Sequence, residues 1–495
     1  MGKRKRTDES AARGKLLDAW VAPDWAGDPV GVVATSFTFT PAFFEEECLA
    51  RFLGLESDPI EDGPVYLYER EEKMAQLSCA AVLVDQHHCQ GTRNLRWDLL
   101  SARLRRGLLH AKVCLLYWTN LARLIISSAN LTEDAYRKNL EVFGVLDFHP
   151  DSDVPVSCLT ETVGFLQECA TYASTDGISN PAVNRWNALL NRVMNECKHW
   201  GVLDAQARRR GLRVRTLFTG PDRPTAFEGL RESWPSASPP DVASVVSPFF
   251  DRPAADNAPA RELWQLIRQR GDAAVHFHVS GEDLPEGKGI LLHAPKSLLL
   301  AQPPGRPGAT TDFYRVVLPG GRPLHAKGIL LECDRWGMYS IGSSNFTSAG
   351  TGLSAHPNLE ANLVYLVDSY RAAEAWEELV ESFPESEPVD LDLDVRWLPL
   401  PAEDEAPVDT VLLPPSFGEA IFDCDEQHQP TLRLTFAGPP PAGWELFTDA
   451  DEQRLWGEPE WTAQGSPEQC DIPWREERPP AGLWVRWNGA EGAAW

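Results

Sequence analysis

The sequence contains no long hydrophobic run. No segment approaches the roughly 18 uncharged apolar residues that a membrane-spanning helix needs, so we expect no membrane association. The first ten residues, MGKRKRTDES, are basic and no apolar segment follows them, which argues against a secretion signal. The run KRKR is typical of a flexible basic tail, and in a eukaryote it also occurs as a nuclear address.

Paired cysteines with the spacing of metal or redox motifs are also absent. The ten cysteines are scattered and none forms a C-x-x-C pair, which predicts free thiols in a reducing compartment, the cytoplasm or, in a eukaryote, the nucleus. His87, His88 and Cys89 are adjacent, but no partner cluster accompanies them. We therefore predict neither a metal site nor a cofactor.

Positive charge is scarce and unevenly placed. The chain of 495 residues has 46 Lys and Arg against 72 Asp and Glu, a net charge of −26. Residues 376–495 hold 27 acidic and six basic residues, a net of −21, so the rest of the chain carries only −5. Residues 90–140 hold nine basic and three acidic residues. The charge distribution therefore permits a nucleic-acid site in the first part of the chain and opposes one in the last part.

Two polar residues introduce an apolar segment, LLHAKVCLLYW, at residues 108–118. The residues 113–118 are apolar, β-branched or aromatic and predict a strand, and a second strand is expected around 124–126. Because side chains two apart on a strand share a face, His110 and Lys112 are expected to project together. The turn after the second strand carries Asn130, and Thr132 is a candidate helix cap.

The same pattern occurs a second time, in PLHAKGILLE at residues 323–332. Seventeen residues separate Lys112 from Asn130, and seventeen separate Lys327 from Asn345. Downstream, the tripeptide Asn-Leu-Glu occurs at 139–141 and again at 358–360. A repeat that keeps polar residues in register while its apolar residues vary indicates chemistry rather than packing.

The paired motif H-x-K, followed by a serine-rich turn and Asn, resembles the phospholipase D superfamily. Most members of that superfamily carry an Asp five residues after the Lys, where this chain has Tyr117 and Glu332. Loss of that Asp, with the Asn kept in SSANLT and GSSNFTSAG, resembles the tyrosyl-DNA phosphodiesterase branch. The segment TSFTFTPAFFEEECLARFLGL is also similar to the opening of related bacterial proteins. The resemblance covers about residues 35–370.

The resemblance implies a metal-independent phosphodiesterase with one active site between two repeats. Its catalytic residues are expected to be His110, Lys112, Asn130, His325, Lys327 and Asn345. Lysines supply positive charge to the phosphoryl oxygens and asparagines donate hydrogen bonds to them, one His forms a phosphohistidine, and the other acts as acid and base. By resemblance the nucleophile is His110. Supporting positions that orient the histidines are expected at Glu141, Glu360, Ser128 and Ser344.

Several arginines precede the first motif and are candidates for substrate binding. They could follow a nucleic-acid backbone, although a solvated helix face explains them equally well. These residues are Arg93, Arg96, Arg103, Arg105 and Arg106. Asp251, after the predicted strand ASVV, either lines the site or begins a helix.

The predicted fold class is α/β: two tandem phospholipase D-like domains facing each other across one active site, plus a small C-terminal β-rich domain. We expect a flexible basic tail at 1–28, a first domain at 29–205, a second at 206–385, and an acidic β-rich domain at 386–495. Alternating segments such as TLRLTFAG and GLWVRWNG support strands in the last domain. That domain is a candidate site for a protein partner, for autoinhibition, or for packing alone.

The expected substrate is a DNA end, with a tyrosyl or other protein adduct at its 3′ side. The alternatives are a nuclease or phosphodiesterase with another substrate, and a catalytically inactive scaffold that binds nucleic acid or protein. Phospholipid cleavage ranks lower, because the Asp is missing and no membrane-binding segment is evident. The complete His, Lys and Asn set in both repeats weighs against an inactive scaffold.

Overall fold

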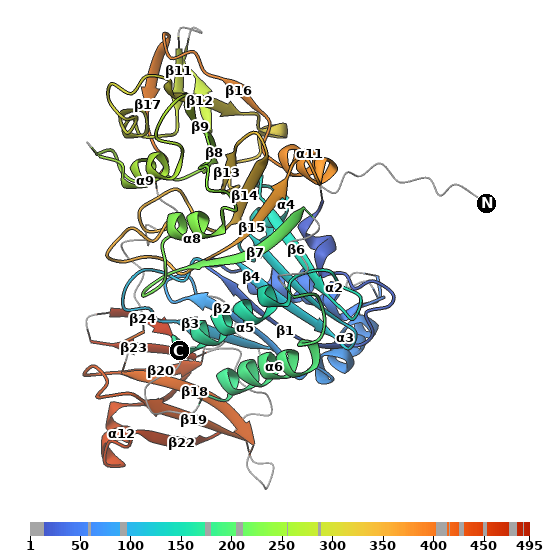
Figure 1. The fold of residues 1–495 in the computed structure, drawn as a ribbon. Coiled ribbons are helices and arrows are strands. Elements are labelled where there is room, and N and C mark those ends of the chain that lie inside the picture. Colours follow the sequence, from blue (N-terminus) through green and yellow to red (C-terminus); the bar gives the residue numbers. More distant parts are fainter. Residues whose placement is uncertain are drawn as a thin grey trace, which may run out of the picture.

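A computed structural model describes residues 14–57, 61–89, 97–173, 180–203, 211–254, 256–285, 289–401, 413–414, 416–424, 430–448, 453–474, 483–488 and 490–495. It has three regions, which Figure 1 shows stacked: the second α/β domain at the top, the first in the middle and a β-rich region at the bottom. The α/β class predicted from the sequence is confirmed, with a large sheet in each of the first two regions.

The first sheet has six strands in the order β3-β2-β1-β4-β5-β6. β1 is parallel to β2 and antiparallel to β4, so a reversal of strand direction lies in the middle of the sheet. The strands β1, β2 and β4 are almost completely buried, which explains their continuous apolar sequences. The bounds are Pro29–Ser36 (β1), Cys79–Asp85 (β2), Asp98–Ala102 (β3), Val113–Trp118 (β4), Leu121–Ser127 (β5) and Phe143–Phe148 (β6).

The second sheet repeats this topology. Its strands β12-β9-β8-β13-β14-β15 follow the same order and directions as β3-β2-β1-β4-β5-β6, with β16 and β7 added at the two edges. The structure therefore contains the internal repeat that the paired motifs predict. The bounds are Leu212–Thr219 (β7), Val242–Val246 (β8), Ala273–Val279 (β9), Ala309–Val316 (β12), Gly328–Glu332 (β13), Trp336–Gly342 (β14), Glu360–Asp368 (β15) and Ser386–Pro388 (β16).

Helices cover the sheets, and the sheets pack on each other. The main helices are α3 (Pro64–Ala75), α5 (Val156–Thr171), α6 (Pro181–Cys197), α8 (Ala226–Ser233), α9 (Ala258–Leu266) and α11 (Ala373–Glu381). One apolar core joins strands of both domains with α5 and α6. At this junction a Cβ on Gly144 would lie 2.4 Å from the Tyr365 hydroxyl, so the close approach of the two sheets requires glycine there.

The β-rich region contains two small sheets around an aromatic core. The orders are β18-β19-β22 and β21-β20-β23-β24, and the core contains Trp444, Trp456 and Trp495. The bounds are Phe417–Cys424 (β18), Pro430–Phe436 (β19), Glu445–Thr448 (β20), Arg454–Gly457 (β21), Glu458–Ala463 (α12), Gln469–Pro473 (β22), Leu483–Trp487 (β23) and Ala490–Ala494 (β24). Both strands predicted here, in TLRLTFAG and GLWVRWNG, are confirmed.

Two predicted boundaries need correction. β16 pairs with β12, and β17 (Asp394–Trp397) pairs with β11 (Gly289–Leu292), which also pairs with β10 (Gly281–Asp283). The second domain therefore extends at least to Trp397 rather than ending at 385. The prediction missed these two edge strands because the segment is acidic in composition.

The predicted N-terminal tail is also too long. A short 3₁₀ helix, η1 (Leu16–Trp20), inserts Leu16 and Trp20 into the core of the first domain. The tail predicted for 1–28 therefore ends before residue 16 at the latest. Next to η1, the segment TSFTFTPAFFEEECLARFLGL (residues 35–55) contains α1 (Pro41–Phe43), the π-helical η2 (Phe44–Leu49) and α2 (Ala50–Leu53).

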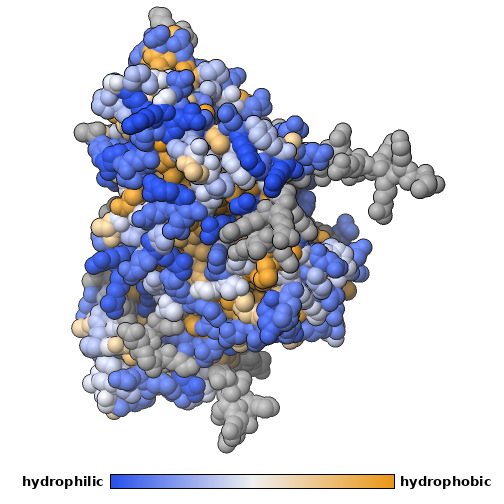
Figure 2. Space-filling view, viewed as in Figure 1, coloured by the Kyte–Doolittle hydropathy of each residue, from blue (hydrophilic) through white to orange (hydrophobic). Residues whose placement is uncertain are grey.

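Hydrophilic residues cover most of the face seen in Figure 2, and hydrophobic residues appear there in small groups. Among the helices of the described residues, none is both long and apolar enough to cross a membrane.

Candidate active site

Two pairs of crossing segments join the domains at the site. Leu109 bridges Leu359, and Leu140 bridges Leu324. Each of these leucines directly precedes a polar residue of the repeat: His110, Glu360, Glu141 and His325, respectively. The His110 amide donates to the Leu359 carbonyl (3.0 Å), and the His325 amide donates to the Leu140 carbonyl (2.9 Å). The backbone therefore brings each histidine beside a glutamate from the other domain.

The first histidine is held by a carboxylate of the second domain. His110 Nδ1 lies 2.9 Å from both Oε1 and Oε2 of Glu360, and both side chains are fully buried. The Ser343 hydroxyl donates to Glu360 Oε2, and the same hydroxyl accepts from the Ala361 amide. Since a carboxylate accepts from Nδ1–H, this contact favours the tautomer in which Nε2 of His110 is the basic nitrogen.

The second histidine is held by a carboxylate of the first domain. His325 Nδ1 lies 2.8 Å from Glu141, and the Ser128 hydroxyl donates to that carboxylate. Burial of Glu141 raises its pKa, but the adjacent His325 and Lys327 and the hydroxyl donor together outweigh burial, so the pKa lies below its ordinary value. The carboxylate is therefore ionised at neutral pH.

The two lysines lie beside the histidines and are almost fully buried. Lys112 Nζ donates to the His110 carbonyl (2.9 Å), and Lys327 Nζ donates to the His325 carbonyl (2.8 Å). Lys327 Nζ also lies 3.0 Å from His325 Nε2. An ammonium can only donate, so Nε2 of this imidazole accepts. Lys112 and Lys327 are two buried side chains, with exposures of 2% and 1%.

An aromatic ring packs on each His-Lys pair, which sequence reasoning missed. Phe37 lies 5.1 Å from the His110 ring and 5.6 Å from Lys112 Nζ. Phe249 lies 6.1 Å from the His325 ring and 5.8 Å from Lys327 Nζ. Phe37 follows the buried strand β1, and Phe249 follows the buried strand β8. The sequence signal that the two share is a serine just before the ring, Ser36 or Ser247. The rings exclude water and leave the charges less screened.

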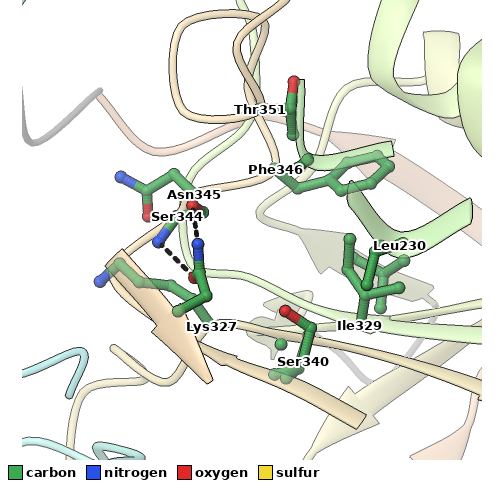
Figure 3. A pocket seen from close by; sticks show the side chains of 13 residues that line it. Leu230, Lys327, Ile329, Ser340, Ser344, Asn345, Phe346 and Thr351 are labelled. Atoms are coloured by element: carbon green, nitrogen blue, oxygen red, sulfur yellow. Dashed lines mark hydrogen bonds between the residues drawn. The ribbon is translucent and has the colours of Figure 1, made fainter. Parts of the chain in front are cut away.

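The two asparagines occupy corresponding positions but have different surroundings. Asn130 Oδ1 accepts from the amides of Phe37 (3.2 Å) and Thr38 (3.3 Å). Asn345 Oδ1 is buried and has no hydrogen-bond donor among the residues that the structure describes. Figure 3 shows the Asn345 carboxamide and the Lys327 side chain projecting to the same side, away from the apolar residues Leu230 and Ile329.

One of the predicted supporting serines does not contact a carboxylate of the site. Ser344 Oγ accepts from Asn362 Nδ2 (2.8 Å), whereas Ser343 contacts Glu360. The correct counterpart of Ser128 is therefore Ser343, two residues before the asparagine in each repeat. Ser344 corresponds in register to Ala129, so the prediction is off by one residue.

Asp251 stabilises the turn that follows Asn345. Its carboxylate accepts from the Ser348 amide (2.9 Å) and the Ser348 hydroxyl (2.7 Å). Asp251 therefore begins no helix, and it acts on the loop rather than on the reacting groups.

The five candidate arginines fall into three groups. Arg93 and Arg96 lie outside the described residues. Arg103 donates to the Phe417 carbonyl (3.3 Å) and so ties the C-terminal region to the first domain. Arg105 and Arg106 are exposed, and neither forms an ion pair within the described part of the chain. They lie next to Gly107, which contacts the loop before Glu360.

The adjacent residues His87, His88 and Cys89 have separate surroundings. His87 Nδ1 lies 2.8 Å from Asp85, His88 packs on Phe37, and Cys89 is buried. Across the described ranges, no three His, Cys, Asp or Glu side chains group as they would around a metal ion.

The site can supply a nucleophile, an acid and base, and positive charge in one buried centre. Each imidazole contacts a carboxylate through Nδ1, so Nε2 is the nitrogen that could take part in chemistry. Two ammonium groups and the Asn130 amide can stabilise negative oxygens. This combination is suited to phosphoryl transfer in two steps.

No protein-family model matches the chain, and no curated protein matches it in sequence. Among solved structures, it is similar to tyrosyl-DNA phosphodiesterase from yeast, with 11% identity over 73% of this chain and 88% of that one, and a TM-score of 0.44. A polyphosphate kinase from Porphyromonas gingivalis is similar over 73% of this chain and 43% of that one, with 11% identity and a TM-score of 0.34.

Proposed function

We propose that the protein is a phosphodiesterase that cleaves a DNA 3′ end through a phosphohistidine, without a metal ion. The observation that carries this proposal is the pair of buried His-Glu contacts exchanged between the domains. A buried carboxylate on each Nδ1 gives two imidazoles of the same tautomer, which both point a basic nitrogen at one centre. Two-step phosphoryl transfer needs both imidazoles, one as the nucleophile and one as the acid and base.

In the first step, Nε2 of His110 attacks phosphorus and forms a P–N bond, while the bond from phosphorus to the leaving oxygen breaks. His325, when protonated at Nε2, gives its proton to that oxygen. Lys112 and Lys327 neutralise the phosphoryl oxygens, and the Asn130 amide donates to one of them. The assignment of His110 to attack follows the family resemblance, since the geometry of the two halves is nearly symmetric.

In the second step, water replaces the histidine. Nε2 of His325 takes one proton from the water, whose oxygen bonds to phosphorus as the P–N bond breaks and its electron pair returns to His110. Glu141 stabilises the imidazolium that forms, because its carboxylate is ionised. The product is a DNA end that keeps its phosphate.

The preference for nucleic acid rests on charge near the first motif. Arg105 and Arg106 are exposed five and four residues before His110, and can bind backbone phosphates. The release of a tyrosyl group or another adduct rests on the resemblance and on the comparison with the yeast enzyme.

The test is to incubate the full-length protein with three substrates: a 3′-phosphotyrosyl oligonucleotide, the same oligonucleotide with a free 3′ end, and phospholipid vesicles. We expect release of tyrosine from the first, with the rate unchanged by excess EDTA. A control variant carrying both His110→Ala and His325→Ala should be inactive.

Each other outcome favours a specific alternative. Cleavage of the plain oligonucleotide alone indicates a nuclease, and release of a lipid headgroup indicates a phospholipase. Turnover that chelation abolishes contradicts the metal-independent mechanism. DNA binding with no cleavage of any substrate supports a scaffold that binds nucleic acid.

A further inference from the structure

The two asparagines of the site differ in the donors around their oxygens, because a proline replaces one of the two amides that hold Asn130. Ser36 accepts from the Leu131 amide and Ser247 accepts from the Phe346 amide, which aligns these serines. The residue after the first serine is Phe37, whose N–H donates to Asn130. The residue after the second serine is Pro248, which has no N–H.

Within the described residues, the missing donor leaves Asn345 with a buried side-chain oxygen that accepts no hydrogen bond. Asn345 is 2% exposed, and its Oδ1 has no donor in the described part of the chain. Asn130 can present only its NH₂ group to the centre, because two amides hold its oxygen. Asn345 has no such restraint, and rotation about its last torsion exchanges the oxygen and the nitrogen.

The hydrolytic step needs an acceptor that the rest of the site does not supply. Two lysines and Asn130 are donors, and the glutamates accept from imidazoles and serine hydroxyls. The attacking water has two O–H groups, and Nε2 of His325 accepts one of them. Asn345 lines the same cavity as Lys327, the lysine beside Nε2, and its Oδ1 is the remaining acceptor among these groups.

We propose that Asn345 accepts the second O–H of the hydrolytic water, and that Pro248 is the positioning residue that leaves its oxygen available. This inference rests on the proposed phosphohistidine mechanism. During attack on the substrate, Asn345 can turn its NH₂ group to a phosphoryl oxygen. During hydrolysis it turns Oδ1 to the water, which directs a lone pair of the water oxygen at phosphorus. In the second step, Asn345 thus acts as a hydrogen-bond acceptor, while Asn130 remains a donor.

The test is Pro248→Ala, which restores an N–H beside Asn345. We expect this N–H to hold Oδ1, as Phe37 holds Asn130. In single-turnover experiments with a 3′-phosphotyrosyl oligonucleotide, formation of the protein–DNA adduct should change by less than about threefold. Hydrolysis of the adduct should slow by about tenfold, the effect of one hydrogen bond. Pro248→Ser restores the same N–H and serves if the Ala variant is unstable by thermal unfolding.

A double-mutant cycle shows whether Pro248 acts through Asn345. Asn345→Ala removes both donor and acceptor and should slow both steps. Adding Pro248→Ala to it should have no further effect on adduct hydrolysis. Unchanged hydrolysis in Pro248→Ala, or an equal slowing in the Asn345→Ala background, overturns the inference. If the wild-type protein forms no adduct at all, the proposed mechanism fails instead, so the two failures are distinguishable.

Discussion

In the first half of the site, two backbone amides hold the asparagine oxygen, whereas in the second half Pro248 replaces one of these amides and the oxygen accepts from none of the described residues. The histidines show no such difference. Each has a glutamate from the opposite domain, a serine on that glutamate, a lysine two residues later and an aromatic ring beside it. The comparison indicates that, in the proposed mechanism, both steps use an imidazole held by a carboxylate. The carboxamide groups of Asn130 and Asn345, in contrast, have different roles.

The largest expected effects distinguish the histidines. His110→Ala and His325→Ala should each lower turnover by at least about 10³-fold. His110→Ala should leave no adduct. In His325→Ala, His110 should still attack a substrate whose leaving group is a phenolate, with a pKa of about 10. An acid-labile adduct should then accumulate at His110. Mass spectrometry locates the adduct, and an adduct on His325 in the His110→Ala protein would reverse the assignment.

The glutamates should repeat this division with roles exchanged between domains. Glu360→Gln lies in the second domain but should slow adduct formation, because it supports His110. Glu141→Gln lies in the first domain but should slow adduct hydrolysis, because it supports His325. Each loss should be roughly 10²- to 10⁴-fold. If each variant instead impairs the histidine of its own domain, as judged by single-turnover kinetics, the exchange does not operate in solution.

Glu141 also makes a prediction about pH and stability. Its pKa is lowered on folding, so its contribution to stability is present above the ordinary carboxyl value and is lost as the pH falls through the lowered value. Urea unfolding at several pH values should show a shallower acid loss in Glu141→Gln than in the parent. An identical pH dependence of the two proteins would mean that His325 and Lys327 do not stabilise the carboxylate.

The C-terminal region allows a comparison of charge between regions. Residues 402–495 hold 19 acidic and five basic residues, a net charge of −14, and their deletion leaves β16 and β17 in the second domain. The truncated protein should bind a DNA end a few-fold more tightly at low salt, and the gain should shrink as salt is added. Fluorescence anisotropy measures this. Loss of binding by a folded truncation would assign a direct contact to the region.

The smallest effect should separate neighbouring serines. Ser343→Ala removes a donor to Glu360 and should slow adduct formation several-fold, corresponding to about 1 kcal/mol. Ser128→Ala should do the same for hydrolysis. Ser344→Ala is the matched control, because its hydroxyl contacts Asn362 instead, and its kinetics should change less. Equal effects at 343 and 344 would contradict the corrected register.

The elements around the motifs could be predicted because local sequence determines them. β4 spans the predicted residues 113–118, and Thr132 caps α4 (Glu133–Arg137) by accepting from the Ala135 amide. Spacing along the chain could not reveal that Glu141 and Glu360 each contact the histidine of the other domain, since these contacts depend on how the two domains dock. The edge strands β16 and β17 were hidden for the same reason, because their partners are distant in sequence. Whether the six motif residues are catalytic stays a prediction.

The exchange also determines when a newly made chain can become active. His110 and its carboxylate are 250 residues apart in sequence, and His325 and its carboxylate are 184 apart. During synthesis the first domain can fold with His110 buried but with no acid beside it, since Glu360 has not yet left the ribosome. A nascent chain, or one that ends before residue 360, therefore lacks the carboxylate that orients His110. In the proposed mechanism, reactivity toward phosphodiesters then arises only when synthesis of the second domain is nearly complete.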